Sequence, residues 1–251
     1  MIAIWSLVLL ALLFFVTSIV GVVTGSNSLV TVPVMFQFGI DEKVAVATNM
    51  FGLTFMAIGG TIPFVRQGSI EFKQLTPLVV LTVVGSAIGA MLVGVITNQS
   101  IKLIVTIAMI VMVLFTLVNP GRSTDGTTNG IRSISPIAYL LTFLLAIYGG
   151  LYSGGYVTIL TATFVAFASM SFGQAVAATK FVNVFSSGIA TVIFMWQRLV
   201  DYRLGIILAV SMFAGAFVGA HYAAKMNEIW LKRIFVATVV VLAIKMLFDF
   251  L

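Results

Sequence analysis

One lysine stands deep inside an apolar stretch that carries no other charge. Lys180 lies about eight residues into the segment 173–196, which as a helix places it roughly 12 Å from the start of the segment. A buried ammonium group needs an anion, carbonyl oxygens or water, or it must extend its side chain back to the membrane interface. Asn183 follows three residues later on the same helical face, so the two side chains together suit a small anion.

Two polar turns interrupt the apolar sequence, one in each half of the chain. Each precedes an apolar segment that is short, 28–39 in the first half and 156–169 in the second. The backbone N–H groups at a helix N-terminus attract anions, although Ser and Asn there are also ordinary caps. We expect both turns to bind an anionic substrate, and Tyr152 and Tyr156 either line its path or serve packing. The turns are Thr24, Gly25, Ser26, Asn27, Ser28 and Tyr152, Ser153, Gly154, Gly155, Tyr156.

A similar pentapeptide follows each short segment. Val44 to Thr48 reads VAVAT, and 131 positions later Ala175 to Thr179 reads AVAAT. The next residues are Asn49 and Lys180, so a neutral donor in one half corresponds to a charge in the other. We expect Asn49 to be a further substrate ligand. Thr48 and Thr179 could either bind substrate or pack between helices, where Thr is favoured.

Groups that commonly carry catalysis are scarce. The sequence contains no cysteine and a single histidine, His221, and its carboxylates fall in loops or near the ends of apolar segments. We find no dinucleotide fingerprint, P-loop or cluster of metal ligands, and therefore expect no cofactor and no metal. The motif LYSGG faintly resembles that of an intramembrane serine protease, but such an enzyme needs a base near the serine. The coupling ion, H⁺ or Na⁺, stays open, with His221 as one candidate for a proton carrier.

The composition is that of an integral membrane protein. Of 251 residues, 61% are hydrophobic and 8% are charged, against about 25% charged in a soluble domain. The apolar runs are long and continuous, which predicts an all-α polytopic fold in lipid rather than a barrel. The net charge of +6 suits cytoplasmic loops better than nucleic acid, which we do not expect as a partner. Segment 2–24 has no preceding Lys or Arg, so we expect it to be retained rather than cleaved as a signal peptide.

The order of the segments suggests two repeats. Residues 1–118 form the first, 119–135 a polar connecting loop, and 136–251 the second. Each short segment rises only roughly 20 Å as a helix, too little for a bilayer core, so it should turn back as a re-entrant hairpin. Three full transmembrane helices then follow in each repeat, and this odd number inverts the second repeat relative to the first. Inverted repeats with broken helices are typical of secondary transporters.

Two further patterns concern orientation and packing. In this topology most loop cations fall on one side, among them Arg66, Lys73 and Lys225. That side should be cytoplasmic, with both termini outside the cytoplasmic membrane. Gly85 with Gly89 and Gly215 with Gly219 have the spacing of closely packed helices, within one chain or between protomers, so the oligomeric state stays open.

The doubled pattern of polar turn, short helix and Ala-Thr helix start is similar to that of the TauE/SafE family of membrane proteins. It reads GVVTGSNSLVTVPVMFQFGIDEKVAVATNMF in the first repeat and YGGLYSGGYVTILTATFVAFASMSFGQAVAATKFVNVF in the second. The family's denser glycines are replaced here by Ser26, Asn27 and Ser28, and Ala162 stands where the second repeat usually has proline. The resemblance implies movement of sulfite, sulfonates such as sulfoacetate, or similar sulfur-containing anions.

Together these patterns predict a secondary transporter of a small sulfur-containing anion that works by alternating access. An anion channel could use the same helix ends and the same lysine. An intramembrane hydrolase is a minor alternative.

Overall fold

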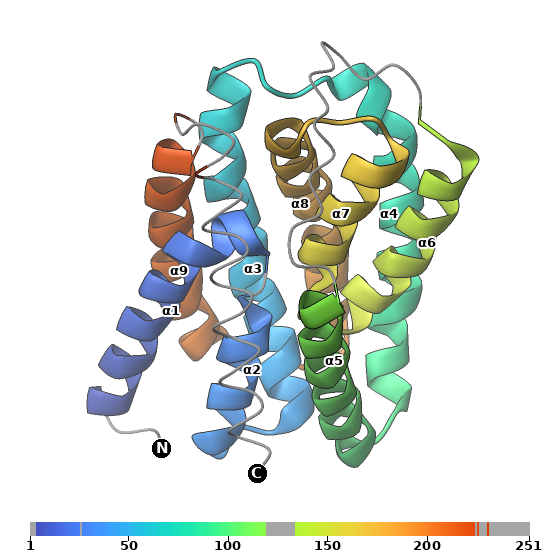
Figure 1. Cartoon of the computed structure of the whole chain (residues 1–251). Coiled ribbons are helices and arrows are strands. Elements are labelled where there is room, and N and C mark those ends of the chain that lie inside the picture. The colour runs from blue at the N-terminus through green and yellow to red at the C-terminus, as the bar shows by residue number, and fades with distance from the viewer. Residues whose placement is uncertain (1–3, 26, 119–133, 224, 226–229, 231–251) are drawn as a thin grey trace.

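The structure, a computed structural model, describes residues 4–25, 27–118, 134–223, 225 and 230. The regular structure of these residues is helical, as the sequence predicts (Figure 1). The expected segment 229–250 and most of the connecting loop lie outside the described residues. The helices are α1 (Ile4–Thr24), α2 (Ser28–Gln37), α3 (Glu42–Arg66), α4 (Phe72–Val95), α5 (Asn98–Val118), α6 (Pro136–Leu151), α7 (Tyr156–Phe167), α8 (Phe172–Trp196) and α9 (Tyr202–Ala223).

Five of these helices are long and apolar enough to cross a membrane: α1, α3, α4, α8 and α9. Their outer surfaces carry large apolar side chains. Leu12 on α1, Val80 on α4 and Val210 on α9 are each more than half exposed. Such a surface is stable against lipid and unfavourable against water, so the protein is integral to a membrane.

Helices α3 and α8 form the centre of the bundle. In their membrane spans 72% and 67% of the residues are buried, against 39% in α1 and in α4. The two helices pack against each other, and each also packs against an outer helix, α9 for α3 and α4 for α8. A capping box fixes where α8 begins: Ser171 Oγ accepts from the Gln174 N–H, and the Gln174 side chain accepts from the Ser171 N–H. This start places Lys180 a little over two turns into the helix.

Both expected re-entrant segments are short helices. Helix α2 has 10 residues and α7 has 12, and each follows a longer helix after a break of a few residues. We call α1 with α2 the first hairpin and α6 with α7 the second. Gly25 and Gly155 have φ of +71° and +79°, a conformation that favours glycine, and they reverse the chain at the two tips. In Figure 1 the first hairpin enters from the lower end and the second from the upper end, so their tips meet near the middle.

The glycine pairs of α4 and α9 pack within this one chain, which answers a question that the sequence left open. A Cβ atom on Gly89 would overlap the Ile147 carbonyl oxygen of α6, and one on Gly219 would overlap the Ile19 carbonyl oxygen of α1. Gly85 approaches α6 and Gly215 approaches α1 in the same way. Each glycine pair therefore lets its helix touch the backbone of the first helix of the other half of the sequence.

Candidate functional site

Three hydrogen bonds join the tips of the two hairpins. Ser28 Oγ lies 3.1 Å from Ser153 Oγ, with 125 positions between them in the sequence. The Tyr152 hydroxyl donates to the Ser28 carbonyl oxygen at 3.0 Å, and Thr158 Oγ1 donates to the Thr24 carbonyl oxygen at 2.6 Å. The two polar turns predicted to act together are therefore in direct contact.

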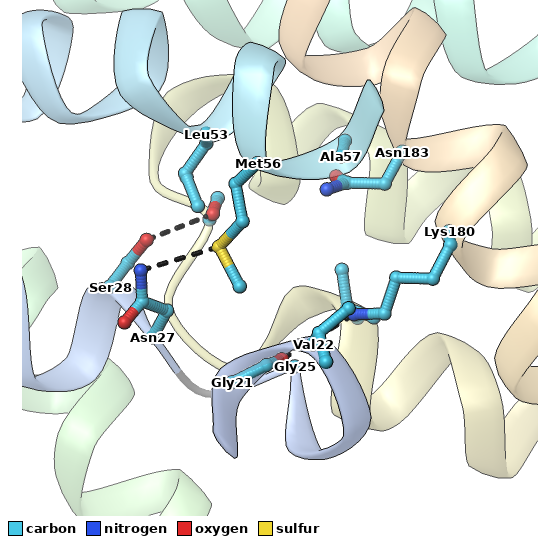
Figure 2. A pocket seen from close by; sticks show the side chains of 12 residues that line it. Gly21, Val22, Gly25, Asn27, Ser28, Leu53, Met56, Ala57, Lys180 and Asn183 are labelled. Carbon is cyan, nitrogen blue, oxygen red and sulfur yellow. Dashed lines mark hydrogen bonds between the residues drawn. The ribbon is translucent and has the colours of Figure 1, made fainter. Parts of the chain in front are cut away.

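A cavity lies between these tips and the central helices α3 and α8 (Figure 2). Its free volume is small, about the room that one water molecule needs. Six residues predicted from sequence line it: Gly25, Asn27, Ser28, Ser153, Lys180 and Asn183. Its other described lining residues are Gly21, Val22, Leu53, Met56, Ala57 and Val157, and none of the described lining residues is acidic.

The Lys180 side chain stays inside the protein. The residue is only 3% exposed, and its Nζ donates to the Gly21 carbonyl oxygen across 3.5 Å, the long limit for such a bond. Figure 2 shows the chain extending from α8 toward the end of α1, not along α8 to the membrane interface. Among the described residues, the ammonium therefore has one weak carbonyl contact and faces cavity-lining residues that include no carboxylate.

Two asparagine side chains also reach the cavity. Asn183 is 6% exposed, its amide points from α8 toward α3 (Figure 2), and it makes no side-chain hydrogen bond to the residues that the structure describes. Asn27 Nδ2 donates to Ser18 Oγ at 3.3 Å and weakly to Met56 Sδ at 3.4 Å. The buried Asn27 Oδ1 has no partner among the described residues. These amides can exchange weak contacts for a ligand at little cost.

Asn49 stands one step behind the cavity and does not line it. Its Nδ2 donates to Ser28 Oγ at 2.9 Å, and its Oδ1 accepts from Thr31 Oγ1 at 2.7 Å. Either hydroxyl can donate in the bond between Ser28 and Ser153, and when Ser28 donates, the Ser153 hydroxyl proton is left for a ligand. The structure thus places Asn49 as a residue that orients Ser28 and Ser153.

The predicted threonines make contacts away from the cavity. Thr48 Oγ1 accepts from the Asp201 N–H at 3.0 Å, beside the start of α9. Thr179 Oγ1 is 3.2 Å from Thr161 Oγ1 and connects α8 to α7. Thr24 belongs to the first tip through its carbonyl oxygen. Ser26 lies outside the described residues.

The remaining residues of the second turn shape the tip. The Tyr152 ring packs over Gly154, where a Cβ would collide with it. The Tyr156 ring packs on Gly149, and its buried hydroxyl points to a separate polar region beside Thr82 and Ser186. Neither tyrosine lines the cavity, so both take the packing alternative, and Gly155 provides the reversal described above.

Sequence reasoning missed the α3 wall of the cavity, made by Leu53, Met56 and Ala57. These residues are four, seven and eight positions after Asn49, which is the helical spacing of a single face. Extending the face of Asn49 along the helix would have found them. Gly21 and Val22 come from the last turn of α1, and Val157 from the first turn of α7.

The arrangement suits an anion. Helices α2 and α7 both begin at the cavity, and their N-termini bring partial positive charge to it beside the Lys180 ammonium. At its centre the cavity has about the room that one water molecule needs. A larger ligand therefore requires the hairpins and the central helices to move apart.

Comparison with known proteins shows similarity to one family of membrane proteins and to several membrane transporters. A family model described as "Sulfite exporter TauE/SafE" matches residues 9–246. The chain is 26% identical to "Probable membrane transporter protein ORF9" of Sinorhizobium sp, over 96% of this chain and 93% of that protein. It is 24% identical to "Probable membrane transporter protein YfcA" of Escherichia coli strain K12, over 96% and 90% of the two chains. No solved structure matches the chain significantly.

Proposed function

Since the chain belongs to the sulfite exporter TauE/SafE family and is a membrane transporter, we propose that it moves a small sulfur-containing anion across the cytoplasmic membrane. The cavity between the hairpin tips is the proposed binding site. Sulfite and sulfonates such as sulfoacetate carry several oxygens on one anionic group. They can therefore accept hydrogen bonds from several directions at once.

One observation carries this proposal: a buried lysine faces a cavity to which none of the described residues supplies a negative charge. Lys180 would pair with the anion, and Asn183, Asn27 and Ser153 would donate to its oxygens. The two helix N-termini would add to the positive potential. In this assignment the lining residues fit an anion better than a cation.

The proposed mechanism is alternating access between two inverted repeats. The opposite directions of the two hairpins support this proposal. So does the packing of the first helix of each half against a helix of the other half, α1 against α9 and α6 against α4. In this mechanism the tips part on one side of the bound anion and close on the other. The near absence of free space at the centre fits an occluded conformation of a carrier better than an open pore.

The proposal is tested by ligand binding to the purified protein in detergent. Sulfite, sulfoacetate, taurine, thiosulfate and sulfate would each be titrated while thermal unfolding is followed. A ligand at a hundred times its Kd stabilises the folded state by about 2.7 kcal/mol, which for a chain of this size raises Tm by about 5–10 °C. We expect at least one sulfur anion to give this shift.

Two variants localise the effect. Lys180→Ala should abolish the shift, whereas Lys102→Ala removes the same charge from the exposed surface of α5 and should leave the shift intact. Binding that is equal in both variants would remove Lys180 from the site. Absence of a shift with every anion would reject the substrate class. In proteoliposomes, a carrier should show saturable exchange of labelled anion, and unsaturable flux would favour a channel.

A further inference from the structure

We propose that Lys180 is also the coupling site, and that it takes up a proton each time an anion binds. This inference rests on the proposed anion site. It assigns the coupling ion as H⁺ and the group that carries it as one amine.

The first argument is the isolation of the Lys180 side chain. It is 3% exposed, and its Nζ has a single described contact, the long bond to the Gly21 carbonyl oxygen. Its side chain also passes close to α3, since a Cβ placed on Gly60 would lie 3.9 Å from the Lys180 δ-carbon. Helix α3 therefore encloses the lysine opposite its own helix α8. Among the residues that the structure describes, the charged form therefore has no counter-ion, and its burial removes most of its contact with bulk water.

No other ionisable group of the described helices faces this amine. Helices α1 and α2 contain no titratable residue, and α8 contains none besides Lys180. In α3, α4, α6, α7 and α9, which also surround the site, the titratable residues lie in the first or last turns of the helices and outside the cavity lining. They are Glu42, Lys43, Arg66, Lys73, Tyr139, Tyr148, Tyr156, Tyr202, Arg203, His221 and Tyr222.

These surroundings link the proton to the anion. A buried amine without a counter-ion avoids the cost of its charge by releasing its proton. A bound anion supplies the missing counter-ion and favours the ammonium form. The binding step is then neutral amine plus proton plus anion giving an ammonium–anion pair, and no bond breaks apart from the one that delivers the proton.

The linkage also fits the demands on a carrier. Alternating access requires both the empty and the loaded site to pass through a conformation closed to water. The empty site then holds a neutral amine, and in the loaded site the ammonium cancels one negative charge of the anion, which is the whole charge of a monoanion and one of the two charges of sulfoacetate. The sum of the proton and anion gradients would then set the direction of transport.

The test uses sulfoacetate as the probe, because it does not titrate between pH 7 and 10. Calorimetric titration of the purified wild type in buffers of different ionisation enthalpy counts the protons taken up per anion. We expect uptake to approach about one proton and Kd to rise by up to about tenfold per pH unit once the empty amine is neutral. Binding at constant Kd over this range without proton uptake would overturn the inference and leave the proposed function standing.

Two substitutions identify the group. Lys180→Arg keeps a charge that cannot be released, so any anion binding that remains should occur without proton uptake. The matched change Lys102→Arg on exposed α5 should behave as wild type. Proton uptake that persists in Lys180→Gln would assign the proton to another residue and reject the inference. If the wild type binds none of the sulfur anions, the proposed function fails and this inference fails with it.

Discussion

Replacing Gly89 by alanine tests the close crossing of α4 and α6. The new Cβ would overlap the Ile147 carbonyl oxygen and lie 2.8 Å from the Leu151 amide nitrogen, so the two backbones must separate. Overpacking of this kind costs about 1–3 kcal/mol, partly offset by the better helix propensity of alanine. Because the overlap is with backbone atoms, we take the upper end of this cost, about 3 kcal/mol, and subtract about 1 kcal/mol for propensity. The expected net loss is about 2 kcal/mol, which for a chain of this size lowers Tm by about 4–8 °C.

The matched control is Gly188→Ala in α8. Among the described residues, no atom lies within 4 Å of a Cβ placed on Gly188, so the substitution adds helix propensity without overlap. It should leave stability unchanged or raise it by up to about 1 kcal/mol. The assay is thermal unfolding of both variants and wild type in the same detergent. Equal stability of the two variants would refute the reasoning, since the crossing would then tolerate an extra atom that the geometry excludes.

Two further predictions concern the hairpin tips and the orientation. Tyr152→Phe removes the hydrogen bond to the Ser28 carbonyl oxygen and should destabilise the fold by about 1–2 kcal/mol in a thermal unfolding assay. The control is Tyr139→Phe, because Tyr139 is half-buried and has no described hydrogen bond, so this change should alter stability little. Equal effects of the two substitutions would show that the Tyr152 hydrogen bond does not stabilise the fold. Because the sequence has no cysteine, Arg203→Cys and Lys73→Cys can each be labelled alone on intact cells with an impermeant thiol reagent. Arg203→Cys should react from outside and Lys73→Cys only after permeabilisation, and the reverse result would invert the predicted orientation.

The sequence predicted the helices well because polar residues and glycines that interrupt an apolar segment indicate clearly where a helix ends. The short segment expected at 28–39 is the helix Ser28–Gln37, and the one expected at 156–169 is Tyr156–Phe167. Gly25 and Gly155 stand where the chain reverses its direction, which cannot happen within a continuous transmembrane helix. The meeting of the two turns was also predicted, since each was short, polar and unable to stay exposed to lipid.

The site was harder to predict, because the role of a polar residue depends on its partners in space. Asn49 and Asn183 looked alike in the sequence, yet Asn49 is held by Ser28 and Thr31 while Asn183 keeps a free amide among the described residues. Thr48 bonds the Asp201 amide, 153 positions away, which no local pattern indicates. Met56 forms part of the wall without any polar signal of its own.

The hydrogen bonds between the hairpin tips also constrain the order in which the protein can be assembled. The carbonyl oxygens of Thr24 and Ser28 accept hydrogen bonds from Thr158 and Tyr152, which are 134 and 124 positions later in the chain. At ~5–20 residues per second of synthesis, the first hairpin waits roughly 10 s for these donors. Until then the contacts between the tips cannot form, and a polar turn is costly in lipid, so the first tip must stay in contact with water or the insertion machinery. The first hairpin is made first and reaches its native contacts late in synthesis.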